Sequence, residues 1–366
     1  MLEKHLFIAD LAPGQSIRDL FVIAEARSGT ARNGPYWNLT LQDESGRVGA
    51  KIWSPLSQSF SELSPGWIAL VSGQVSTYRD TLQVVIDELR LLDQEQEEVS
   101  LAGLIKQSAT DPAVLLERLE ALCKLHLSHR PLRKLTSKVL GHEEIRARLL
   151  QGTGAKAIHH AYVGGLLEHT LSVCQLCIKY CEQYPQLDKQ ILLTAAIFHD
   201  LGKAWELSSG LTFEYTDHGR LLGHIFLGLE ILAPFIAKSG LEPELVMHLK
   251  HIILSHHGEY EYGSPRRPKT AEAMALHYAD NMDAKMNQFS EVFAQRPQPV
   301  LGEEYTDEKG VRAETGWSDY QRSLERFLYL PAHTPLPAKA PKPVVKAEAE
   351  ATAQKEADQC SLPLKE

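Results

Sequence analysis

The chain has 366 residues, of which 43% are hydrophobic and 23% charged, and its formal net charge is −9. This length suits two or three compact units, each with enough apolar residues for a buried core. The negative charge argues against a protein that coats nucleic acid by global attraction, because that mode needs a basic surface to displace counterions. Local basic patches are still compatible with it.

The opening segment and the cysteines indicate a soluble, cytoplasmic protein. The segment MLEKHLFIADLAPG places charged residues where a signal peptide needs an apolar stretch. We find no apolar run near the roughly 20 residues of a membrane span, so we expect no membrane partner. Five cysteines are too few for a disulfide scaffold. Cys174, Cys177 and Cys181 share one helical face and are expected to be reduced core residues.

Residues 1–95 are expected to form a five-stranded barrel. Five runs with a period of two, separated by Gly, Asn, Asp and Pro, occur between residues 16 and 92. The polar stretch SPLSQSFSELSPG, between the third and fourth runs, has room for one helix, which gives the element order of an OB-fold. The expected fold class is therefore multidomain: an N-terminal all-β OB-fold barrel, an all-α helical bundle and a disordered C-terminal tail.

The second and third strands are predicted to carry a nucleic-acid-binding face. Their inward positions are apolar, whereas several outward positions are basic or aromatic. Such side chains can follow phosphates and stack unpaired bases. In the alternative, the aromatic rings merely cover the barrel rim and the charges are solvated. The candidate contacts are Tyr36, Arg47, Lys51, Trp53, Tyr78 and Arg79.

Beyond residue 100 the hydrophobic period changes from 2 to 3.6, which predicts helices up to residue 330. We expect a helical connector at 96–150 and a helical bundle at 151–330. Residues 331–366 are rich in Pro, Ala, Lys and Glu and are predicted to form the disordered tail. The expected helices cover residues 112–127, 130–151, 165–184, 188–203, 218–238, 242–257 and 270–296.

Histidines and aspartates recur within these apolar helices. A single histidine there is usually a hydrogen-bonded core residue. Six such residues favour a metal site, because imidazoles and carboxylates that project into a bundle commonly hold metal ions. The adjacent pair His199 and Asp200 is costly to bury unless the carboxylate meets a cation. The six candidate ligands are His169, His199, Asp200, His224, His256 and Asp280.

Residues beside these motifs are candidates for catalysis or substrate contact. Lys203 could reach a scissile phosphate and stabilise charge there, or instead interact with a helix end. His257 could protonate the leaving oxygen, with a hydrogen-bonding role behind a ligand as the alternative. Asp283 is expected to have a supporting or capping role. The weaker candidates for contact with a substrate phosphate are His159, His160 and Lys285.

The order His, His-Asp, His, His, Asp is similar to that of the HD-domain metal-dependent phosphohydrolases. His224 and His256 match the additional ligand positions of binuclear members, so the resemblance implies two divalent metals bridged by Asp200. Two such ions can hold a hydroxide that attacks a phosphodiester. The mixture of nitrogen and oxygen ligands favours manganese or iron over an all-oxygen magnesium or calcium site. We expect manganese first, with iron, cobalt or magnesium as alternatives.

The combination of an OB-like barrel and an HD domain resembles the YhaM family of 3′-5′ exoribonucleases over most of residues 1–330. The phrases HHAYVGGLLEHT, FHDLGK, GRLLGHI, LSHHGEYEYGSPRRPKT and LHYADNMDAKM look like that family's motifs. The resemblance implies metal-dependent removal of nucleotides from the 3′ end of single-stranded RNA, and also action on single-stranded DNA. Arg266, Arg267 and Lys269 would then steer the strand toward the site, with an inert basic loop as the alternative.

Two other functions stay open. One is an HD-domain phosphohydrolase of small nucleotides or cyclic dinucleotides, although the GYP-containing motif of the cyclic di-GMP branch is absent. The other is a non-catalytic nucleic-acid-binding factor, against which the complete ligand set argues. A homo-oligomer is compatible with the sequence but cannot be read from it.

Overall fold

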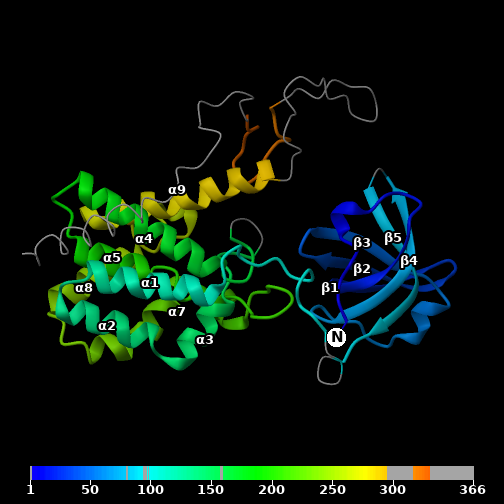
Figure 1. The fold of residues 1–366 in the computed structure, drawn as a ribbon, viewed down its shortest axis with the longest axis horizontal. Coiled ribbons are helices and arrows are strands. Elements are labelled where there is room, and N and C mark those ends of the chain that lie inside the picture. Colours follow the sequence, from blue (N-terminus) through cyan, green and yellow to red (C-terminus); the bar gives the residue numbers. More distant parts are fainter. Residues whose placement is uncertain are drawn as a thin grey trace, which may run out of the picture. The chain divides into compact units, whose positions relative to one another are not determined.

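The structure is a computed structural model, and it describes residues 2–79, 81–93, 97, 99–156, 160–294 and 316–329. The chain divides into two compact units, Met1–Glu291 and Val292–Glu366. In the first unit a β-barrel is followed by helices, which confirms the predicted fold class (Figure 1). The predicted tail at 331–366 and the candidate His159 lie outside the described residues.

The five strands close into a barrel in the order β1-β2-β3-β5-β4. Strand β3 pairs with β5 in parallel, and the other neighbours are antiparallel. Alternate residues fill the interior as the period of two predicts: Leu39 lies opposite Ala50, and both are buried. The strands are β1 (Ser16–Ala31), β2 (Gly34–Asp43), β3 (Gly46–Ile52), β4 (Ile68–Tyr78) and β5 (Thr81–Leu91).

The helix expected between β3 and β4 is only a short 3-10 turn, η2 (Leu56–Ser59). Serine is frequent in this segment, and its hydroxyl competes with helical hydrogen bonds. Here the Ser57 hydroxyl donates to the backbone carbonyl of Pro35 in β2, at 2.6 Å. The segment is therefore held by side-chain hydrogen bonding to the barrel and does not continue as an α-helix.

A buried ion pair fastens the N-terminal segment, including η1 (Ile8–Asp10), to the barrel. Lys4 Nζ lies 3.2 Å from Asp43 Oδ2, and both side chains are fully buried. The ammonium also donates to the Leu20 carbonyl at 2.7 Å and lies 3.7 Å from the centroid of the Phe21 ring. These contacts compensate a charge that would otherwise be costly to bury.

The helices differ from the predicted ones mainly at their ends. The helix expected at 130–151 is two helices separated at Gly141, and the one expected at 188–203 stops at Phe198. The described helices are α1 (Pro112–His126), α2 (Arg130–Leu140), α3 (Glu143–Gln151), α4 (Gly165–Gln183), α5 (Lys189–Phe198), α6 (Lys203–Glu206), α7 (Asp217–Ala237), α8 (Pro243–Leu254) and α9 (Ala271–Ala294), with the 3-10 turn η3 (Tyr260–Tyr262).

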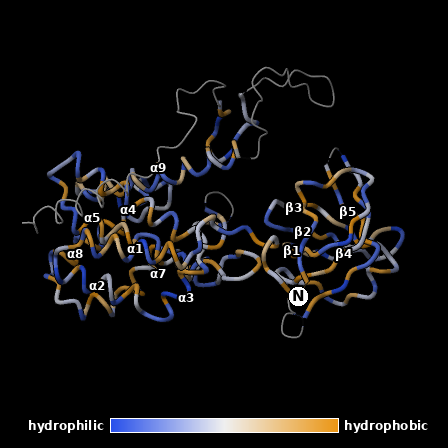
Figure 2. The backbone as a smooth tube through the Cα atoms, in the orientation of Figure 1, coloured by the Kyte–Doolittle hydropathy of each residue, from blue (hydrophilic) through white to orange (hydrophobic). Residues whose placement is uncertain are grey.

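Helices α1 to α3 belong to the same hydrophobic core as the rest of the helical region. Leu116, Leu132 and Leu149 are buried in one cluster with Leu192 of α5 and Leu249 of α8. Figure 2 shows hydrophobic residues recurring along these helices. Within the helical connector predicted at 96–150, α1 to α3 thus share the hydrophobic core of the later helices. Cys174 and Cys177 are buried free thiols in this core, as expected.

Helix α7 is more apolar than the sequence analysis allowed. By length and composition alone it could cross a membrane, so the expectation that no apolar run approaches that length is wrong for this segment. The helix is interrupted at Gly223, which has φ 73°, and it contains Pro234. Its buried residues Leu232 and Ile236 join the helical core. We therefore interpret α7 as a helix of the bundle.

Candidate metal centre

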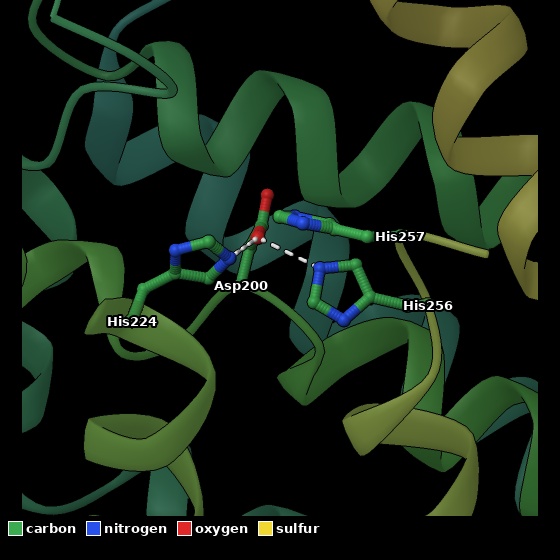
Figure 3. A group of neighbouring side chains, drawn as sticks. All are labelled: Asp200, His224, His256 and His257. Carbon is green, nitrogen blue, oxygen red and sulfur yellow. Dashed lines mark ion pairs between the residues drawn. The ribbon is translucent and has the colours of Figure 1, made fainter. Parts of the chain in front are cut away.

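Asp200 lies between two groups of imidazoles. It follows α5 in the turn that leads to α6, and its side chain is 2% exposed. Its Oδ2 atom lies 3.3 Å from His169 Nε2 and 3.4 Å from His199 Nε2. Its Oδ1 atom lies 3.5 Å from Nε2 of both His224 and His256, on the other side (Figure 3). One carboxylate therefore faces two separate sets of nitrogen donors.

Two more side chains complete these sets. Asp280 Oδ1 lies 3.2 Å from His169 Nε2, and the His257 ring lies against the His256 ring with 4.4 Å between centroids. In each set the candidate ligand atoms lie within 4.8 Å of one another. The first set is His169, His199, Asp200 and Asp280, and the second is Asp200, His224, His256 and His257.

Backbone carbonyls fix the orientation of three of these imidazoles. Nδ1 of His199 and Nδ1 of His256 lie 2.8 and 2.7 Å from the carbonyl oxygen three residues earlier in the chain. Nδ1 of His257 lies 2.8 Å from the carbonyl oxygen of Tyr262. A carbonyl can only accept, so each neutral ring carries its proton on Nδ1 and leaves the Nε2 lone pair free. That is the tautomer a metal ligand needs.

Carboxylates hold the other two imidazoles in the same way. Asp283 Oδ2 lies 2.6 Å from His169 Nδ1, and its other oxygen accepts from the Ser172 hydroxyl. Glu206 lies 3.2 Å from His224 Nδ1 and also accepts from the His224 backbone N–H at 3.1 Å. Carboxylates behind ligating histidines fix the ring and raise its basicity. The geometry fits the supporting role expected of Asp283.

The donor atoms fit divalent cations. Among the described residues, Asp200 Oδ1 and Nε2 of His224 and of His256 are buried without a hydrogen-bond partner. In addition, Nε2 of His169 lies 3.2 Å from Nε2 of His199, which brings two potential lone pairs together. Buried polar atoms are normally satisfied, so a cluster of unsatisfied acceptors indicates that a cation belongs there. Mixed imidazole and carboxylate donors suit a transition metal.

Lys203 places a cationic side chain directly beside Asp200. Its Nζ atom lies 2.7 Å from Asp200 Oδ2, and its side chain lines the cavity beside the centre. Burial lowers the pKa of this ammonium, but the carboxylates of Asp200 and Asp280 outweigh burial and raise it above the usual value. Lys203 is therefore charged at neutral pH.

A glycine contact sets the distance between the turn after α5 and α7. A Cβ atom on Gly202 would lie 1.9 Å from the carbonyl oxygen of His224 and 2.6 Å from the backbone nitrogen of Gly228. Side chains do not approach backbone atoms so closely. The glycine in FHDLGK thus lets the segment that carries His199 and Asp200 approach the helix that carries His224.

Several predicted substrate contacts lie away from this centre. His160 is buried with Nε2 3.0 Å from Asp283 Oδ2, so it contacts the carboxylate that orients His169 and does not line the cavity. Lys285 is exposed on α9 and does not line the cavity. The three basic residues predicted to steer the strand do not line the cavity either. Arg267 pairs with Glu259 at 2.7 Å, and the other two, Arg266 and Lys269, line a groove beside α8.

The predicted role of His257 as a proton donor does not match its surroundings. Its Nδ1–H is already bonded to a carbonyl, and only a doubly protonated ring would present a second N–H. Burial, followed by the charges of His256 and His224, lowers the pKa of His257 to about 3. The neutral ring offers an acceptor, which suits a ligand better than an acid.

On the barrel, most of the predicted nucleic-acid contacts come together. Lys51 Nζ lies 5.7, 5.0 and 5.5 Å from the ring centroids of Tyr36, Trp53 and Tyr78. Arg79 stacks over Tyr78 at 5.4 Å. Arg47, by contrast, lies near the other end of β3, four residues from Lys51, and donates to Gln42. It does not join the cluster.

Other residues of the cavity were not predicted from the sequence. Tyr215, Tyr262 and Lys156 line the cavity beside the metal centre together with Glu206. They come from separate loops and from the short helix α6, so no helical or strand period connects them with the ligands. The one available signal was proximity to ligand motifs, as for Tyr262 after LSHHG.

Comparisons with known proteins agree with both domains. A family model described as the HD domain matches residues 166–285, and one described as an OB-fold nucleic acid binding domain matches residues 22–92. Among solved structures, the second OB-fold domain of replication protein A from Methanococcus maripaludis is 22% identical, and the alignment covers 27% of this chain and 100% of that chain at a TM-score of 0.22. An OB domain from Methanosarcina mazei is 21% identical over 25% of this chain and 84% of its own, at a TM-score of 0.21. At these scores we infer nothing from the two structures.

A relative of known activity matches most of the chain. The chain is 34% identical over 277 residues to the 3′-5′ exoribonuclease YhaM of Bacillus subtilis, an alignment that spans 75% of this chain and 86% of the relative. The HD domain of this chain, together with this relationship, makes the protein a hydrolase. The resemblance drawn from the sequence motifs is thereby confirmed: the protein belongs to the YhaM family.

Proposed function

We propose that the protein removes nucleotides from the 3′ end of single-stranded RNA, and that it also acts on single-stranded DNA. The observation that carries this proposal is the position of Asp200, whose two oxygens each lie 3.3–3.5 Å from a different pair of imidazoles. A carboxylate shared between two donor sets is what a two-metal phosphodiesterase requires. The relationship to B. subtilis YhaM supports both RNA as substrate and the direction of cleavage.

The donor sets support two divalent cations, with manganese as the first choice and iron, cobalt or magnesium as alternatives. When bound, such ions supply an activated water and neutralise charge on the scissile phosphate. One ion would be held by His169, His199 and Asp280, the other by His224, His256 and His257, and both by Asp200.

The remaining chemistry comes from side chains of this chain. The charged ammonium of Lys203, beside Asp200 on the cavity wall, attracts the scissile phosphate and stabilises the charge that develops on it. Asp283 and Glu206 keep the rings of His169 and His224 oriented, so that no reorientation is needed during the reaction.

The barrel supplies binding of the rest of the strand. Three aromatic rings surround Lys51, and Trp53 and Tyr78 are 40% and 54% exposed. Exposed rings stack on bases of any identity, while an ammonium among them contacts the backbone phosphate. Such a platform favours an unpaired strand, because paired bases do not offer their faces.

The proposal is tested with 5′-labelled single-stranded RNA and manganese. The full-length protein should produce a ladder that shortens stepwise from the 3′ end, and a 3′-phosphate should slow the first step. Asp200→Ala should give no ladder while remaining folded. Hydrolysis confined to deoxynucleoside triphosphates or cyclic dinucleotides would overturn the proposal, and a ladder from the Asp200→Ala protein would exclude this centre as its source.

A further inference from the structure

The cavity beside the metal centre has the size of a site for one small ligand. Its volume is about 320 Å³, near the lower end of the roughly 300–1,000 Å³ found for ligand sites. The wall nearest the centre is formed by Lys203, His224, His257 and Asp280. Much of the remaining wall comes from loops and from α9, and neither metal binding nor phosphate binding accounts for the loop residues.

Two tyrosines from different loops line this cavity with exposed rings. Tyr215 lies between α6 and α7, pairs with Leu207 in an isolated antiparallel β-bridge, and is 43% exposed. Tyr262 lies in η3 and is 65% exposed, although its backbone carbonyl is held by His257. Neither hydroxyl makes a hydrogen bond to another residue in the described part of the chain. Rings this exposed contribute little to the core, so their stabilising role is small.

The surroundings of the rings are polar and partly cationic. Lys156 Nζ lies 5.9 Å from the centroid of the Tyr215 ring and 2.6 Å from Glu214 Oε2. A cavity that combines a cation at its rim, aromatic faces and a metal centre offers a separate contact to each part of a nucleotide. The metal centre and Lys203 account for the phosphate, whereas the aromatic faces are the groups that match a base.

We infer that Tyr215 and Tyr262 form the binding site for the nucleobase of the 3′-terminal nucleotide, next to the scissile phosphodiester. This inference rests on the proposed function and adds the residues that position its substrate. Stacking on aromatic faces accepts all four bases, because each base has a π-face. It also places the scissile phosphate at the same point in each round of cleavage, whichever base is terminal.

The test compares RNA that ends in an ordinary nucleotide with RNA of the same length that ends in an abasic one. Tyr215→Ala and Tyr262→Ala should each lower kcat/KM for the ordinary RNA by roughly 5- to 150-fold, mainly through KM, since stacking contributes about 1–3 kcal/mol per base. Tyr215→Phe and Tyr262→Phe keep the ring and should restore most of the rate. On the abasic RNA the unaltered protein should lose a similar factor, and the alanine variants should lose little more.

Tyr260→Ala is the matched control. Tyr260 belongs to the same turn as Tyr262 and is 55% exposed, but it does not line the cavity. Its removal should leave kcat/KM within about twofold, and manganese binding measured by calorimetry should be unchanged in all the tyrosine variants. Alanine variants that degrade ordinary RNA at the full rate would overturn the inference, as would equal losses on ordinary and abasic ends.

The failure of the proposed function has a different signature. If the unaltered protein degraded neither kind of RNA, the proposed function and this site would both be wrong. If it degraded RNA from the 3′ end and the two tyrosines made no difference, only the nucleobase site would be wrong.

Discussion

Replacement of Gly202 by alanine should disrupt the metal centre without touching any ligand. The new Cβ atom would lie 1.9 Å from the His224 carbonyl oxygen, and real Cβ atoms essentially never come closer than 3.0 Å to such a neighbour. Relief therefore requires the turn and α7 to separate by about 1 Å (3.0 less 1.9 Å). The obstacle is backbone on both sides, so no side-chain rotation can absorb it.

The separation moves Asp200 away from His224, because Gly202 follows Asp200 by two residues and lies against the backbone of His224. Asp200 Oδ1 and His224 Nε2 lie 3.5 Å apart, and in the proposed centre they hold the same ion. A displacement of about 1 Å in such a site lowers the rate by about 100-fold, and overpacking destabilises the fold by about 1–3 kcal/mol. We therefore expect Gly202→Ala to bind manganese more weakly and to cleave single-stranded RNA about 100 times more slowly, while remaining folded.

Gly228→Ala is the control at the same helix crossing. Its Cβ atom would lie 3.3 Å from the Gly202 nitrogen, a distance that a shift of a few tenths of an ångström relieves. Alanine within α7 also has a better helix propensity, by about 1 kcal/mol. Isothermal calorimetry with manganese, single-turnover cleavage and thermal unfolding would compare both variants. A folded Gly202→Ala protein with unchanged manganese affinity and rate would refute this account of the contact.

Four further outcomes follow from the geometry. Asp283→Asn should weaken manganese binding by about 10- to 100-fold in calorimetry, and unchanged affinity would show that this carboxylate does not orient its histidine. Trp53→Ala should weaken binding of single-stranded RNA by roughly 5- to 150-fold in fluorescence anisotropy, whereas Arg47→Gln should have little effect; equal losses would contradict the stacking cluster. Asp43→Ala should destabilise the protein by about 3–5 kcal/mol in urea unfolding, because Lys4 stays buried without its partner. Burial lowers the pKa of Lys4 below 10.5 in the folded protein, so between that lowered pKa and 10.5 the unfolded chain binds more protons than the folded one. The free energy of unfolding should therefore rise with pH toward 10.5. Lys4→Met should lack this rise.

The parts of the fold that the sequence predicted were those with a regular period. Alternation in β2 and β3 identified Leu39 and Ala50 as interior residues and put Lys51 and Trp53 outside. The six residues predicted to bind metal were likewise singled out, because titratable residues in apolar helices are costly unless a site uses them, and the structure brings their side chains together. The order of the motifs along the chain then pointed to the HD family.

The parts that could not be predicted depend on tertiary contacts. Nothing in the local sequence reveals that His160 hydrogen-bonds to Asp283, more than a hundred residues away, or that Arg267 pairs with Glu259 and not with substrate. The role of His257 depended on a carbonyl five residues ahead, which only the turn η3 brings to its Nδ1 atom. The cavity tyrosines come from loops, where no period exists to mark an inward-facing side chain.

The closure of the barrel limits how it can hold a nucleic acid or any other extended chain. Each of its five strands has a hydrogen-bonded neighbour on both sides over part of its length. Backbone N–H and C=O groups along those stretches are occupied, so a partner cannot be added there as a sixth strand. Along these stretches the barrel can therefore bind a partner only through its side chains. Rings that accept any base would then give the barrel of the proposed exoribonuclease affinity for a strand without preference for its sequence.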